Sequence, residues 1–218
     1  MVVGWVCALA VLPAGASARV EPESSGSANE IVTDAGLSAD AGFMAQWVIK
    51  NGDNRGMPFA IVDKKSAHLY VYAPAGRLLG GSRVLLGLSV GDASITDIGA
   101  RAPASLRPTE RTTPAGRFAS EPGHNAQGED NVWFDYDASL AIHRLRPGPA
   151  NEHRGDRMYS SSTSERRISF GCVVVPVAFY DAVVRPSLGR QRGIVYILPE
   201  THPVGDMIRD VQLSLGGA

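Results

Sequence analysis

Short runs of apolar and β-branched residues, separated by polar turn clusters, dominate the middle of the chain. Residues 59–63 and 68–72 are two such runs on either side of the polar turn 64–66, a pattern typical of a β-hairpin. Further strands are expected at 80–88, 116–118, 132–136, 139–143, 168–175 and 193–198. Many short strands joined by turns predict a mainly β, sandwich-like domain.

Two segments instead predict short helices. Residues 43–50 are followed at once by the turn cluster Asn51-Gly52-Asp53-Asn54, which would end a helix there. Residues 177–184 form an apolar segment, and Pro176 fits its first turn, where a missing N–H costs nothing. The predicted fold class is therefore mainly β with one or two short helices.

The ends of the chain differ in composition from the middle. Residues 2–12 are an apolar run, followed by Pro13 and by Ala16-Ser17-Ala18, the small-x-small pattern of an export signal. A run of this length is too short to span a hydrocarbon core of about 30 Å, so no integral membrane span is expected once the signal is removed. We expect a signal peptide over 1–18, a flexible leader over 19–55 that includes the first helix, a folded domain over 56–200 and a C-terminal tail over 201–218.

Charge and composition exclude some classes of partner. The formal net charge of -1 gives no overall field that favours nucleic acid. Aromatic residues make up 7% of the chain, which argues against a carbohydrate-stacking surface. No metal-ligand spacing and no glycine-rich phosphate loop is present, so neither a metal nor a cofactor is expected.

The cysteines are the first candidates for chemistry. Removal of the signal would take Cys7 away and leave Cys172 as a single thiol in a periplasmic or other extracytoplasmic compartment. Such a thiol is either buried and inert or kept for its reactivity. Gly171 permits a sharp turn just before the sulfur. The helix expected at 177–184 would bring N–H groups near Cys172, lower the thiol pKa and hold an oxyanion.

A nucleophilic cysteine needs a base, and histidine is the usual one. Of the five histidines, His143 is the best candidate because it ends a predicted strand, which would fix its position. A structural histidine at a strand end is the alternative. His153, inside the loop 144–167, is the second candidate base.

Four segments, in order along residues 58–200, resemble the YkuD-type L,D-transpeptidase catalytic domain. They are the hairpin 59–72, the sequence Thr113-Pro114-Ala115-Gly116-Arg117-Phe118, the pair Ile142-His143 and the sequence Ser169-Phe170-Gly171-Cys172. The resemblance implies a β-sandwich-like domain with its cysteine at the mouth of a cleft. It also implies action on peptidoglycan stem peptides, in cross-linking or remodelling of the cell wall that determines cell shape.

The same resemblance implies a role for each matching residue. Cys172 would attack the carbonyl between the third residue of the stem peptide and its terminal D-Ala, forming a thioester. His143 would be the general base, and Ser169 and Gly171 would support the site.

The chain departs from the family pattern at three positions. Phe170 replaces a histidine, Val174 replaces an asparagine or arginine, and Arg144 replaces a small residue. These changes bear on the acceptor of the acyl group more than on acylation. Two alternatives stay open: an L,D-carboxypeptidase or hydrolase that uses water as acceptor, and a catalytically weak domain that binds the wall.

The long connection 144–167 contains six arginines. Stem peptides carry carboxylates, which arginine binds in a bidentate manner, so the loop is a candidate basic lid over the cleft. Arg144 and Arg167, at its two ends, are the candidate substrate-binding residues. A solvated mobile loop is the alternative.

Overall fold

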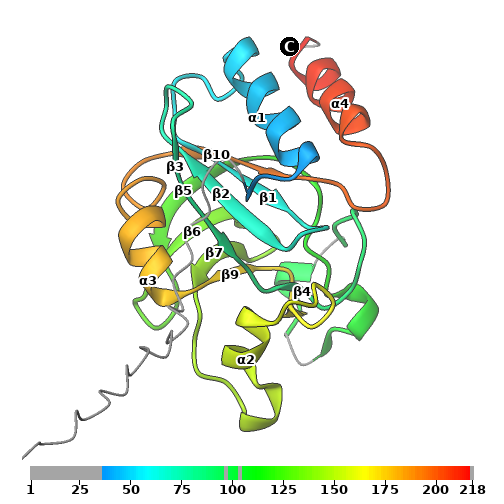
Figure 1. Cartoon of the computed structure of the whole chain (residues 1–218). Coiled ribbons are helices and arrows are strands. Elements are labelled where there is room, and N and C mark those ends of the chain that lie inside the picture. The colour runs from blue at the N-terminus through cyan, green and yellow to red at the C-terminus, as the bar shows by residue number, and fades with distance from the viewer. Residues whose placement is uncertain (1–35, 96–97, 103–104, 217–218) are drawn as a thin grey trace, which may run out of the picture.

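The computed structural model describes residues 36–95, 98–102 and 105–216 (Figure 1). The predicted signal peptide, Cys7 and the first part of the predicted leader lie outside these residues. None of the helices in the described ranges is long and apolar enough to cross a bilayer.

A single eight-stranded sheet forms the body of the molecule, with strand order β3-β2-β1-β10-β5-β6-β7-β9. β1 pairs with β10, and β7 with β9, in parallel, and the other neighbours are antiparallel. A second, two-stranded sheet joins β4 and β8. The strands are β1 (Phe59–Asp63), β2 (His68–Tyr72), β3 (Leu78–Arg83), β4 (Leu86–Gly87), β5 (Gly116–His124), β6 (Asp130–Asp135), β7 (Leu140–Arg144), β8 (Arg167–Ser169), β9 (Val173–Val175) and β10 (Gly193–Ile197).

The sheet curls around one hydrophobic core, which confirms the mainly β, sandwich-like prediction. Ala60 and Val62 of β1 share this core with Val132 of β6 and Ile142 of β7, from the other half of the sheet. The alternate β1 side chains, Phe59 and Ile61, face a second core on the outside. Burial on both faces explains why β1 is apolar throughout and not alternating.

Two helices cover the outer face of β1 and β10 and lie side by side (Figure 1). They are α1 (Ala39–Asn51) and α4 (Val204–Gly216). Ser38 caps α1 by accepting a hydrogen bond from the N–H of Ala41 at 3.1 Å, and Gly52 ends it in the left-handed conformation.

Three shorter helical segments lie elsewhere in the described part of the chain. α2 (Arg154–Tyr159) lies within the long connection, and α3 (Val177–Phe179) continues as the π-helical turn η6 (Tyr180–Val184) after Pro176. The predicted helix over 177–184 is thus confirmed. Single 3-10 turns are η2 (Ile98–Ala100), η4 (Pro108–Glu110) and η5 (Ala150–Glu152).

The sequence underestimated the helical content at both ends. The helix predicted over 43–50 is confirmed, but it begins earlier, at Ala39, and Met44 and Val48 are fully buried. Residues 204–216, expected as a tail, are also helical, and Met207 and Ile208 pack in the same outer core. Each helix has one apolar stripe, which becomes buried only when the sheet face beneath it exists.

Candidate active site

Cys172 lies in a tight turn between β8 and β9. Gly171 has φ 130°, and a Cβ atom there would lie 2.8 Å from both the Thr112 carbonyl oxygen and a methyl group of Leu140. Only glycine fits a position with this backbone conformation and this lack of space. The expected run 168–175 is therefore two strands, and the turn between them presents the thiol.

Ser169 and Thr113 brace that turn. The Ser169 hydroxyl donates to the Cys172 carbonyl at 2.7 Å and accepts from the Gly171 N–H at 3.1 Å. The Thr113 hydroxyl donates to the Gly171 carbonyl at 2.9 Å. Both side chains therefore hold the backbone around the sulfur in one position.

His143 is brought beside the cysteine turn by strand pairing. β7 and β9 pair in parallel with His143 opposite Val174, two residues after Cys172. His143 Nδ1 lies 2.8 Å from the Arg144 carbonyl oxygen. Because a carbonyl can only accept, Nδ1 carries the hydrogen and Nε2 keeps a lone pair, the tautomer that a base needs.

Both groups are neutral at neutral pH. Burial lowers the pKa of His143 to about 4, although the hydrogen bond to the Arg144 carbonyl opposes the change. Burial also raises the pKa of the Cys172 thiol, whose sulfur lies 3.7 Å from the Ser139 carbonyl oxygen. The resting pair is therefore a thiol and an uncharged imidazole, not a thiolate and an imidazolium.

The expected help from a helix N-terminus is absent at the cysteine. β9 separates Cys172 from α3, which begins only at Val177. A helix terminus acts over about one turn, so it does not lower this thiol pKa. The prediction of a lowered Cys172 pKa was wrong, because burial disfavours the thiolate and the helix predicted over 177–184 begins too far along the chain to oppose this.

A cavity of about 190 Å³ contains the two groups. Its lining residues are Leu85, His143, Arg146, Arg154, Ile168, Ser169, Phe170, Cys172 and Val174. The wall is largely apolar, with two arginines. Phe170 is 37% exposed, and the guanidinium of Arg111 lies over its ring, 4.5 Å from the centroid.

Arg144 and Arg167, the substrate-binding candidates from the sequence, form ion pairs within the fold. Arg144 is hydrogen-bonded to Asp181 at 2.7 Å and lies over the ring of Tyr180. Arg167 is 8% exposed and forms an ion pair with Glu200. Their guanidinium groups are engaged by these partners and do not line the cavity.

Arg146 and Arg154 are the arginines that line the cavity. Both come from the connection 144–167, which contains α2. Met158 of α2 is fully buried and packs with Leu85 and Val174, so the connection forms a wall of the site.

The second candidate base lies elsewhere. His153 lines a separate hollow between the start of α2 and Val177, and its side chain is 67% exposed. Of the two candidate bases, only His143 shares a cavity with Cys172. Among the described residues there is also no cluster of three or more His, Cys, Asp or Glu that could hold a metal ion.

The structure is similar to solved L,D-transpeptidase catalytic domains, the class of protein that the sequence motifs resemble. The catalytic domain of the Enterococcus faecium enzyme aligns with 15% identity and a TM-score of 0.37 over 64% of this chain and 95% of its own. The enzyme from Xylanimonas cellulosilytica aligns with 18% identity and a TM-score of 0.40, over 65% of this chain and 60% of its own.

A third similar structure is the helical cell shape determining protein Pgp2 from Campylobacter jejuni. It aligns with 14% identity and a TM-score of 0.43, over 73% of this chain and 56% of its own. No protein-family model and no curated protein matches the chain. At these identities and TM-scores nothing about activity follows from the likeness, so the function is inferred from the site itself.

Proposed function

We propose that this protein is an exported cysteine acyltransferase that acts on peptidoglycan stem peptides, with the activity of an L,D-transpeptidase. The observation that carries the proposal is the single cavity shared by Cys172 and His143, with the histidine held in the tautomer of a base. The four ordered sequence motifs support it independently.

Cys172 and His143 together supply the nucleophile and the proton transfers that acylation needs. His143 Nε2 takes the proton from the Cys172 thiol as the sulfur attacks the carbonyl carbon between the third residue and the terminal D-Ala. The C–S bond forms, the C–N bond breaks, and the protonated imidazole returns its proton to the leaving amine of D-Ala. General-base assistance is required here, because the raised thiol pKa leaves little thiolate at neutral pH.

The second step returns the enzyme to its starting state. An amine of a neighbouring stem peptide attacks the thioester, forming a new amide as the C–S bond breaks and the thiol is restored. Water as the acceptor would give a carboxypeptidase instead. Phe170 and Val174 line the cavity with Cys172 and make its wall less polar than the family motif implies, so they bear on the choice of acceptor.

Mass spectrometry of the protein incubated with a disaccharide tetrapeptide tests the proposal. We expect a thioester adduct on Cys172 equal to the substrate without D-Ala, and cross-linked dimers among the products. Cys172→Ala removes the adduct completely, and His143→Ala slows its formation by about 10²- to 10⁴-fold.

The same measurement separates the alternatives. Tripeptide without dimers would identify a carboxypeptidase. The absence of any adduct from the substrate or from a carbapenem would contradict an acyltransferase and favour a wall-binding domain. Export is tested separately, by locating the protein in fractionated cells: we expect it outside the cytoplasm, without residues 1–18.

A further inference from the structure

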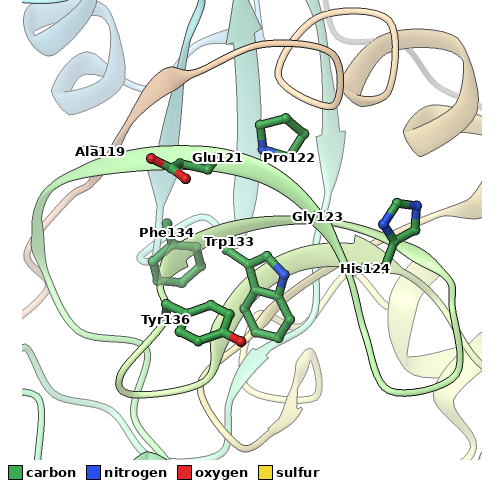
Figure 2. A pocket seen from close by; sticks show the side chains of 8 residues that line it. All are labelled: Ala119, Glu121, Pro122, Gly123, His124, Trp133, Phe134 and Tyr136. Carbon is green, nitrogen blue, oxygen red and sulfur yellow. The ribbon is translucent and has the colours of Figure 1, made fainter.

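Another hollow, of about 430 Å³, lies over β5, β6 and the turn after β6. Figure 2 shows the indole of Trp133 and the phenol ring of Tyr136 next to each other in it, and the two ring centroids are 5.4 Å apart. Tyr136 is 75% exposed. Glu121 and His124 lie at the border of the same hollow. We call this hollow the aromatic cleft.

Strand register builds the aromatic cleft from local sequence. Trp133 lies opposite Glu121, and Gly123 lies two residues further along β5. A Cβ atom on Gly123 would be 2.8 Å from the indole, so the missing side chain makes the space in which the indole lies. A large exposed tyrosine and a tryptophan in one hollow are typical of a ligand site.

The aromatic cleft and the active site share one face of the sheet. Trp133 pairs with Ala141 on β7, and His143 is the next residue of β7 on that face. Such diagonal neighbours are about 7–8 Å apart. Ile142 pairs with Val173, so Cys172, one residue earlier, comes beside Ala141. Ala141 in turn pairs with Trp133. Cys172 and Trp133 are therefore separated by two strand spacings, or about 10 Å.

The carboxylates in and beside the aromatic cleft already have partners. Glu121 forms an ion pair with Arg192 at 2.6 Å, and His124 lies 3.3 Å from Asp130. A cationic ligand would find no unpaired carboxylate there. A neutral ring with C–H groups on one face and hydroxyl or amide groups on its rim fits better, since aromatic faces carry partial negative charge and the rim groups reach the flanking polar side chains.

We propose that the aromatic cleft binds the N-acetylated amino sugar that carries the donor stem peptide. This inference rests on the proposed function, which places the third residue of the stem at Cys172. Three extended residues span about 10–11 Å, so the sugar-bearing end of an acylating stem reaches the position of Trp133. The low aromatic content of the chain argued against a sugar-stacking surface, but the fold brings Trp133 and Tyr136 together in one cleft.

Calorimetric binding to the full chain carrying Cys172→Ala, which cannot be acylated, tests this inference. The two ligands are the disaccharide tetrapeptide and the same tetrapeptide without sugar. We expect the sugar to strengthen binding about tenfold, the effect of one good aromatic contact together with its rim hydrogen bonds. Adding Trp133→Ala removes this difference and leaves the affinity for the free tetrapeptide unchanged.

A second variant and a control guard against misfolding. Tyr136 is so exposed that Tyr136→Ala should leave the fold intact and reduce the sugar effect. Phe43→Ala removes another exposed ring, on α1, and should leave the sugar effect unchanged. Equal affinities for the two ligands, no binding of either, or an equal loss of both with Trp133→Ala would overturn the inference.

Turnover by the wild-type protein separates this inference from the proposed function. Release of D-Ala from both substrates without any preference for sugar would overturn the sugar site alone. If the sugar strengthens binding but neither substrate is turned over, the sugar site stands and the proposed acyltransferase function is refuted.

Discussion

At the scale of single residues, the proposed chemistry depends on two groups that burial keeps uncharged. His143 has its Nδ1 hydrogen fixed by the Arg144 carbonyl and its pKa lowered to about 4. Cys172 has its pKa raised by the same exclusion of water. The sequence predicted the identity of the pair, but not its ionisation, because burial is a property of the folded cavity.

The first prediction concerns the pH dependence of acylation. Since His143 acts as a base only when neutral, the rate should be nearly constant from pH 8 to about pH 6 and be half lost near pH 4. The measurement is D-Ala release from a tetrapeptide across this pH range. His153→Gln should give the wild-type profile, whereas a half-loss near the ordinary histidine pKa of about 6.5 would show that His143 is not buried as described.

The lowered pKa also has a consequence for stability. The unfolded chain binds a proton at His143 more readily than the folded chain, so the free energy of unfolding falls as the pH drops from about 6.5 towards 4. In the His143→Gln variant, the free energy of unfolding should decrease less over the same pH range.

At the scale of elements, a buried lysine connects three segments to the cysteine turn. Lys64, directly after β1, is fully buried and donates to Asp92 at 2.6 Å and to the Thr113 carbonyl at 2.9 Å. Thr113 in turn donates to Gly171. Burial lowers the pKa of Lys64, although the hydrogen bond to Asp92 opposes this. Removal of this ammonium group would take one hydrogen-bond donor away from the Asp92 carboxylate and one from the Thr113 carbonyl.

The second prediction compares adjacent lysines. Lys64→Met should lower the free energy of unfolding by about 3–5 kcal/mol, the cost of breaking a buried ion pair from one side. Lys65→Met removes only the exposed pair with Asp40 and should cost less than about 1 kcal/mol. Urea unfolding of both variants measures the difference, and equal losses would contradict a structural role for Lys64.

At the scale of the whole molecule, the helices α1 and α4 and the candidate active site lie over different strands of the curled sheet. α1 and α4 cover the outer face of β1 and β10, whereas the connection with α2 packs near β4 and walls the cavity (Figure 1). Arg146 and Arg154 reach the cavity from this connection. They are the two cationic side chains that line the cavity, and each is also paired with a carboxylate, Arg146 with Glu129 at 2.7 Å and Arg154 with Glu152.

The third prediction concerns these two arginines. Arg146→Ala together with Arg154→Ala should raise the KM for a tetrapeptide at least about tenfold, the loss of one charged hydrogen bond, with a much smaller effect on kcat. Arg209→Ala, on α4 and exposed, is the matched control. An unchanged KM in steady-state kinetics would refute a substrate-binding role for the connection.

Local patterns predicted a large part of the fold. β1 and β2 have the predicted bounds, because their apolar content and the turn between them are both local signals. The run 80–88 is instead two strands, β3 and β4, which pair with different partners. A run of apolar residues does not specify its partner, so the break could not be seen in the sequence.

What the sequence by itself determined is the mainly β class, the cysteine turn that Gly171 requires, and the choice of Cys172 and His143, since each depends on residues close together in the chain. Only the tertiary structure decided which arginines line the cavity, that the thiol pKa is raised, and that Trp133 and Tyr136 form a cleft on the face that carries His143. Those properties depend on burial and on strand register, which arise when segments far apart in the sequence pack together.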